Sequence, residues 1–155
     1  VLVTARVPER EKLVKWGGPI GPDDWVLLAR GDSPITLTSL EQARQYRVGA
    51  YKGDAIALSL EKQGRAPVIV LRDQDNARKL QAGQIDLWAT GAPAGQFLAR
   101  QVGISGFKTV LRFHQAELYL ALNKDVPDEL VSKLQKALDQ LRAEGVLQKI
   151  SAKYL

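Results

Sequence analysis

The stretch "QIDLWATGAPAGQFLARQ", residues 84–101, joins a short apolar run to an amphipathic segment. The apolar residues at 85–89 lack helical spacing, and they predict a buried strand. Residues 90–95 are all small or rigid, and residues 93–103 then predict a helix. Such a strand–turn–helix unit is typical of a parallel α/β sheet. The small residues predict a turn at the strand end, residues 90–95, where a ligand can approach the backbone.

The same alternation of strands and helices continues on both sides of this stretch. It predicts an α/β fold with a mainly parallel sheet, in which ligands bind beyond the carboxyl ends of the strands. We expect strands at residues 47–51, 67–71, 85–90, 108–113 and 117–123, and helices at residues 38–46, 53–64, 75–83, 93–103, 127–145 and 146–154.

Three local patterns fix the expected element ends. Thr38 precedes Glu41 by three positions, which predicts a capping box at the start of a helix. Asp54 is expected to cap the next helix, and Gly64 to end it. The all-apolar run at residues 67–71 predicts a strand that is buried on both faces.

Composition excludes several classes of protein. The 155 residues, 45% of them hydrophobic, suffice for one packed domain, and no apolar run reaches the roughly 20 residues of a membrane span. The absence of Cys and the single histidine, His114, argue against a disulfide, a metal site or a Ser-His-Asp triad. We therefore expect no metal and no cofactor. The first residues show no signal-peptide pattern.

The net charge of +5 raises the question of nucleic-acid binding. Basic residues are interleaved with acidic ones, as in "LRDQDNARK", and the few aromatic residues do not alternate with Lys or Arg. We therefore expect solvated basic faces and no nucleic-acid partner. The charge favours an anionic ligand or an acidic partner surface.

Several segments together resemble a known family. They are "VLVTARVPEREKLVKWGGPI", "DWVLLARGDSPI", "YRVGAYKGDA", "LQAGQIDLWATGAPAG" and the stretch from Glu117 to the end, "ELYLALNKDVPDELVSKLQKALDQLRAEGVLQKISAKYL". In order and spacing they resemble the bacterial extracytoplasmic (periplasmic) solute-binding proteins of family 3, the substrate-binding components of ABC transporters for polar amino acids. The resemblance covers nearly the whole chain.

The resemblance implies a type II periplasmic-binding-protein-like fold of two lobes that hold a ligand between them. The opening part of the family pattern has no counterpart here, so we expect only part of the first lobe. Residues 1–24 and 109–155 would form this partial lobe with crossing segments, and residues 25–108 a crossing strand with the complete second lobe. Apolar surface at residues 1–3 would then be exposed and could support a homodimer.

The resemblance also suggests ligand-binding residues in both lobes. Arg10 matches the family's carboxylate-binding arginine, whose guanidinium donates two parallel hydrogen bonds; the alternative is a solvated Arg10 paired with an adjacent glutamate. Thr4 lies near the family's hydroxyl positions. Arg6 has no fixed family role and is either a second anion ligand or a surface residue.

In the second lobe, Gly53 and Asp54 occupy the helix start at which the family holds a ligand carboxylate. Asp54 replaces the usual Ser or Thr, and it either only caps the helix or favours a cationic or hydroxylated ligand group. Thr90 and Gly91 end the strand of the opening stretch. Gly91 stands where family members usually place an aspartate for the ligand's ammonium, so we expect a preference for a small carboxylate or other anion.

These observations predict a solute-binding protein without enzymatic activity. Its partners would be a small-molecule solute, amino-acid-like or an organic anion, and the membrane permease of an ABC importer, and its location would be the periplasm. Two alternatives on the same fold are a ligand-sensing domain of a signalling protein and a dehydratase. A dehydratase needs a general acid in the cleft, for which Asp54 is the candidate.

Overall fold

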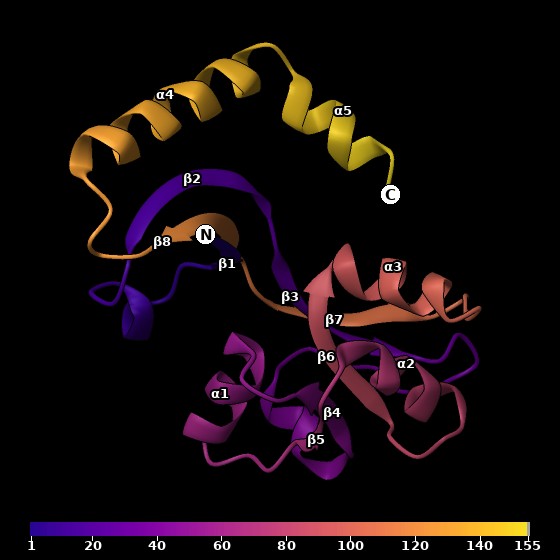
Figure 1. Ribbon diagram of the computed structural model, residues 1–155. Helices are drawn as coiled ribbons and strands as arrows, with labels where there is room; N and C mark the ends of the chain where they lie inside the picture. Colours follow the sequence, from indigo (N-terminus) through magenta and orange to yellow (C-terminus); the bar gives the residue numbers. More distant parts are fainter. Residues whose placement is uncertain (155) are drawn as a thin grey trace. The chain divides into compact units, whose positions relative to one another are not determined.

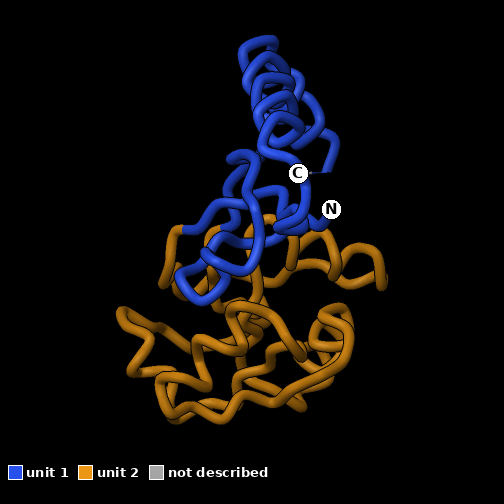
Figure 2. Tube along the Cα trace, turned by 60° about the vertical axis from the view of Figure 1, so that its left-hand side comes forward, with its two compact units in different colours: residues 1–23, 116–155 blue, residues 24–115 orange. Residues whose placement is uncertain are grey.

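The computed structural model describes residues 1–154, which form two compact units (Figure 2). Unit 1 contains residues 1–23 and 116–155, and unit 2 contains residues 24–115. The chain enters unit 2 at Asp24, within a Gly/Pro-rich stretch at residues 17–25. The strand at residues 108–114 belongs to unit 2, whereas we had expected residues from 109 onward to belong with the first lobe.

Unit 2 is built on a five-stranded sheet (Figure 1). Its strands are β3 (Asp24–Ala29), β4 (Val48–Tyr51), β5 (Val68–Val70), β6 (Leu87–Ala92) and β7 (Lys108–His114), in the spatial order β5–β4–β6–β3–β7. β4 pairs in parallel with β5 and β6, whereas β3 pairs antiparallel with β6 and β7. The sheet is therefore mixed, with β3 running against the other strands.

Three helices and a 3₁₀ turn connect these strands. They are η2 (Glu41–Gln45), α1 (Ala55–Lys62), α2 (Asp73–Gln81) and α3 (Ala94–Gln101). The core on one face joins Val26 and Leu28 of β3 to Trp88, with Leu80 of α2 and Ala99 of α3. Leu27 lies between the two β3 residues in sequence and is 0% exposed. Because alternate strand residues face opposite ways, the sheet is covered on both faces.

Unit 1 contains a three-stranded antiparallel sheet and two C-terminal helices. The strands are β1 (Leu2–Ala5), β2 (Lys15–Pro22) and β8 (Glu117–Leu122), in the order β1–β8–β2. A 3₁₀ turn, η1 (Pro8–Arg10), follows β1, and the helices are α4 (Asp128–Ala143) and α5 (Val146–Ala152). Gln135 anchors α4 to β2, because its amide accepts from the Gly18 N–H at 2.9 Å and donates to the Gly18 carbonyl at 2.8 Å.

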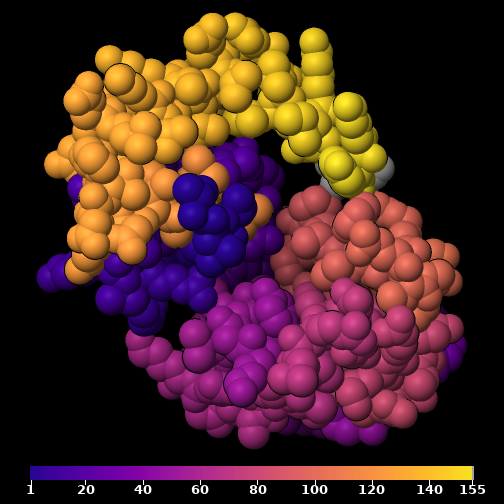
Figure 3. Space-filling view, in the orientation of Figure 1, coloured from indigo at the N-terminus to yellow at the C-terminus, as the bar shows by residue number. Residues whose placement is uncertain are grey.

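Much apolar surface of unit 1 is exposed, as the sequence predicted. Val1, Leu2 and Val3 are 89%, 66% and 51% exposed, and Leu130 on α4 is 48% exposed. Figure 3 shows this N-terminal segment, in indigo, uncovered on the face in view. Within residues 1–154, no helix is both long and apolar enough to cross a bilayer.

Two expectations about local structure are wrong. Residues 67–71 do not form a central strand: β5 is the edge of the sheet, and Val68 and Ile69 are 38% and 39% exposed. Residues 38–46 form only the short η2, without a capping box. Gln42, one position after Glu41, accepts the Thr38 N–H at 2.7 Å, whereas Glu41 binds arginine side chains.

Candidate functional site

Two of the predicted residues in unit 1 lie in contact. Thr4 is on β1 and Arg10 ends η1, and the turn between them folds the arginine back over the strand. The Arg10 Nη1 donates to the Thr4 Oγ1 at 2.6 Å, and it lies 3.5 Å from the Ala5 carbonyl oxygen. A hydroxyl that accepts from a guanidinium still has a proton to donate. The pair therefore combines a cation with a hydroxyl donor, which suits a carboxylate.

Arg6 occupies a different environment. Its guanidinium forms a two-point ion pair with Glu11, with Nε–Oε2 and Nη2–Oε1 distances of 2.8 and 2.5 Å. It also lies over the rings of Trp16 and Tyr119, at 5.4 and 5.1 Å from their centroids. The hydrogen bond between Arg6 and Glu11 raises the pKa of Arg6 and lowers the pKa of the Glu11 carboxyl. Arg6 is thus held in a structural cluster whose carboxylate balances its charge.

Gly53 and Asp54 join the carboxyl end of β4 to the start of α1. Gly53 has a φ of +78°, a conformation that favours glycine. Asp54 occupies the N-cap position as predicted, and its backbone carbonyl accepts from the Leu58 N–H at 3.0 Å. Its side chain makes no capping hydrogen bond to α1 within the described chain.

Thr90 and Gly91 are not in a turn, contrary to the expectation from the sequence. β6 continues to Ala92, and these two residues pair with Val26 and Trp25 of β3. Thr90 is 2% exposed, and its hydroxyl donates to the Asp73 Oδ2 at 2.7 Å. The Thr90 side chain is therefore part of the buried interior of unit 2.

The small residues at 90–95 are explained in part by packing between α3 and β6. A Cβ added to Gly95 would lie 2.3 Å from the Thr90 Cγ2 and 3.1 Å from the Leu28 Cδ1. No side chain fits at those distances without a shift of the strand or the helix. Gly95 thus permits the close approach of α3 to its own sheet.

A buried hydrogen-bond network centred on Asp73 was not predicted from the sequence. Asp73 begins α2, and its Oδ1 accepts from the Trp88 Nε1 at 2.8 Å and from the Asn76 Nδ2 at 3.2 Å. With the Thr90 hydroxyl, three buried donors surround one carboxylate. Burial raises the pKa of Asp73, and the three hydrogen bonds oppose that rise. The only sequence signal was a pair of donors two residues apart on one face of β6.

The turn at Gly53 and Asp54 and the end of β6 lie at the same edge of the sheet of unit 2. β4 and β6 pair in parallel, with Val48 opposite Leu87. Their carboxyl ends therefore lie at the same edge, which brings the turn at Gly53 and Asp54 near the end of β6 at Gly91. Such an edge is where open α/β sheets bind ligands.

No protein-family model and no curated protein matches the chain. Solved structures do match. A histidine kinase sensor domain with similarity to periplasmic binding proteins shares 24% identity with a TM-score of 0.84, covering 99% of this chain and 68% of that chain. The GluR0 ligand-binding core from Nostoc punctiforme, in complex with L-glutamate, shares 19% identity with a TM-score of 0.83, covering 100% of this chain and 71% of that chain.

A mutant of ArgBP from T. maritima is also similar, with 19% identity and a TM-score of 0.82 over 97% of this chain and 66% of that chain. The chain therefore spans about two thirds of the length of each of these proteins. At such identities the likeness shows the fold alone. It confirms the predicted fold class, an α/β fold of the periplasmic-binding-protein-like type.

Proposed function

We propose that the protein binds a small solute, amino-acid-like or an organic anion. The observation that carries this proposal is the contact between Arg10 and Thr4, which combines a guanidinium with a hydroxyl. Within unit 2, the turn at Gly53 and Asp54 lies at the sheet edge where α/β folds bind ligands. The similar structures support binding as the general function, since one of them holds L-glutamate.

The chemistry of these residues favours one ligand class. Arg10 offers its charge to a carboxylate, because a fork of N–H donors matches two carboxylate oxygens. Gly91 has no side chain with which to hold an ammonium group. Asp54 carries a negative charge at the sheet edge of unit 2. We therefore infer a preference for a small carboxylate over a zwitterionic α-amino acid, with Asp54 directed to a hydroxylated group on the ligand.

The proposed role is delivery of the solute to the permease of an ABC importer, outside the cytoplasm and without enzymatic chemistry. A ligand-sensing domain of a signalling protein is the second candidate. It is favoured by the similarity over 99% of this chain to a histidine kinase sensor domain. Both roles require reversible solute binding, so a binding measurement tests what they share.

Calorimetric titration of the protein with a panel of ligands tests this proposal. The panel contains simple mono- and dicarboxylates, hydroxy acids and the standard amino acids. We expect saturable binding of a carboxylate that is at least about tenfold tighter than that of the amino acid with the same carbon skeleton, the effect of one ion pair. Saturable binding of amino acids alone would overturn the ligand class. Chemical conversion of the tightest ligand by the protein would contradict the proposed absence of chemistry.

A further inference from the structure

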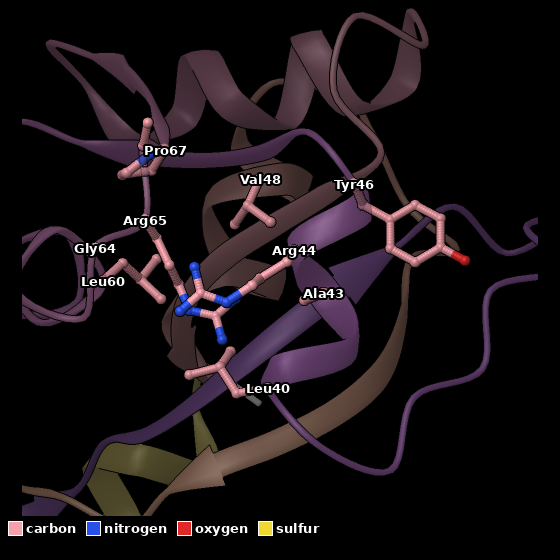
Figure 4. Close-up of a pocket in the computed structure, with 10 residues that line it drawn as sticks. Leu40, Ala43, Arg44, Tyr46, Val48, Leu60, Gly64, Arg65 and Pro67 are labelled. Atoms are coloured by element: carbon pink, nitrogen blue, oxygen red, sulfur yellow. The ribbon is translucent and has the colours of Figure 1, made fainter.

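Unit 2 contains a cavity of about 350 Å³ that none of the predicted ligand-binding residues lines (Figure 4). It lies between η2, the start of β4, the end of α1 and the connection from α1 to β5. Its walls include Leu40, Leu60 and Pro67, and the side chains of Arg44 and Arg65 reach into it (Figure 4). The volume falls in the range of small-molecule sites, roughly 300–1,000 Å³.

Arg65 is an unusual residue for a cavity wall, because its side chain is buried and one of its hydrogen-bond donors has no acceptor among the described residues. Its side chain is 10% exposed, and its Nη2 lies 3.3 Å from the Glu41 Oε2. Its Nε is buried and has no hydrogen-bond partner among the described residues. Burial and the neighbouring Arg44 lower the pKa of this guanidinium. A buried donor without an acceptor is costly, so an acceptor from outside the chain would stabilise this arrangement.

Arg44 supplies a second cation at the same place. Its Nε donates to the Glu41 Oε1 at 2.6 Å, and its Nη2 donates to the Gln63 carbonyl at 3.1 Å. Glu41 thus bridges both arginines from the solvent side, with its own side chain 70% exposed. Two guanidiniums face one carboxylate, which leaves one positive charge unbalanced within this group. The charge matches a ligand with a single negative charge.

We propose that this cavity binds a small monocarboxylate with an apolar body, its carboxylate held by Arg65 and Arg44 and its hydrocarbon packed against Leu40, Leu60 and Pro67. The guanidinium of Arg65 donates to one carboxylate oxygen, and that of Arg44 to the other. The apolar walls distinguish this ligand from a simple inorganic anion, which would gain nothing from them.

This site is separate from the proposed solute contacts. β4 runs from Val48, which lines the cavity, to Tyr51, after which Gly53 and Asp54 follow. The cavity is therefore at the amino-terminal end of β4, and the solute contacts of unit 2 are at its carboxyl end. Either proposal can fail without the other.

The test uses benzoate as the probe and inorganic phosphate as the comparison. In proton–nitrogen correlation spectra, the buried Arg65 Nε–H should give its own signal, whose shift on titration reports binding at this guanidinium. We expect saturable shifts of the Arg65 and Arg44 Nε–H signals with benzoate. Phosphate should bind at least about tenfold more weakly, because the apolar walls contribute only to benzoate.

Matched variants locate the site. Arg65→Met and Arg44→Met keep the length and apolar surface of each side chain, and each should weaken benzoate binding about tenfold or more, the loss of one charge-assisted hydrogen bond. The control is Arg78→Met on α2, whose side chain is 55% exposed and pairs with Asp75. Arg78→Met removes the same positive charge from an exposed helix face, and it should change the affinity for benzoate less than about twofold. If Arg65→Met fails to fold, Arg44→Met and the wild-type spectra still decide.

Three results would overturn the proposal. The first is the absence of a saturable shift with benzoate. The second is binding that survives the change at Arg44 as well as that at Arg65. The third is equal affinity for phosphate and benzoate, which would show that the apolar walls take no part.

Discussion

Two replacements of Asp73 test separately how the charge of its carboxylate and the hydrogen bonds it accepts contribute to stability. Asp73→Asn keeps an oxygen for the Trp88 Nε1 and the Asn76 Nδ2, and the new amide can donate to the Thr90 hydroxyl, which then accepts. Asp73→Ala leaves all three donors without an acceptor. At neutral pH we expect Asp73→Ala to lower the free energy of unfolding by about 2–5 kcal/mol. Each unsatisfied buried donor costs about 1–3 kcal/mol, and partial relaxation of the structure reduces the sum. Asp73→Asn should cost less than about 1 kcal/mol.

The raised pKa of Asp73 adds a dependence on pH with a definite sign. A carboxyl whose pKa is higher in the folded state than in the unfolded state binds its proton more tightly when folded. Its contribution to stability is therefore complete below the unfolded pKa of about 3.8 and is lost as pH rises through the folded pKa. The Asp73→Asn variant carries no titrating group at this position and has no such loss. The stability advantage of the wild type over Asp73→Asn should therefore shrink as pH rises.

Urea unfolding between about pH 3 and pH 8, followed by Trp fluorescence, measures both effects. Asp75→Asn is the matched control on the same helix, where a partly exposed carboxylate pairs with Arg72 and Arg78. It should cost no more than about 1 kcal/mol, as surface ion pairs do. The reasoning is refuted if Asp73→Ala is no less stable than Asp73→Asn, or if the wild type and Asp73→Asn respond identically to pH.

Two further predictions concern packing and association. Gly95→Ala should lower the free energy of unfolding by about 1–3 kcal/mol in chemical denaturation, because its Cβ would lie 2.3 Å from Thr90. Gly21→Ala is the control, since a Cβ there would have no atom within 4 Å, and it should cost under about 1 kcal/mol. Equal costs for the two variants would contradict the close approach of α3 to its sheet. Leu2→Lys on the edge strand β1 should reduce self-association seen by light scattering, since Leu2 is 66% exposed. A wild-type protein that stays monomeric at every concentration would exclude the proposed homodimer.

The order of strands and helices was predictable because periodicity reports it directly. The helices α1, α2 and α3 each end near a glycine with positive φ, at Gly64, Gly83 and Gly103, and such glycines are visible in a sequence. The buried strand β6 was predicted from an apolar run at residues 85–90. The position of β5 was not predictable, since an apolar run does not tell a central strand from an edge strand.

The candidate site was predictable only in part. Arg10 and Thr4 were named from the resemblance alone, and their contact is visible only in the structure. The pairing of Arg6 with Glu11, and the burial of Thr90 against Asp73, depend on which side chains fold together. Glu41 shows the same limit: its spacing from Thr38 fits a capping box, yet Arg44 and Arg65 offer it stronger, charged partners.

The most direct test of the proposed function is the affinity of Arg10→Met for the tightest carboxylate found by calorimetry. A buried charge-assisted hydrogen bond contributes about 1.5–3 kcal/mol, so this change should weaken binding roughly ten- to a hundredfold. Lys133→Met is the control, because it removes one positive charge from unit 1 at a side chain that is 71% exposed on α4. We predict an unchanged affinity for that control. Carboxylate binding of the same strength in Arg10→Met as in the wild type would contradict the proposed role of Arg10.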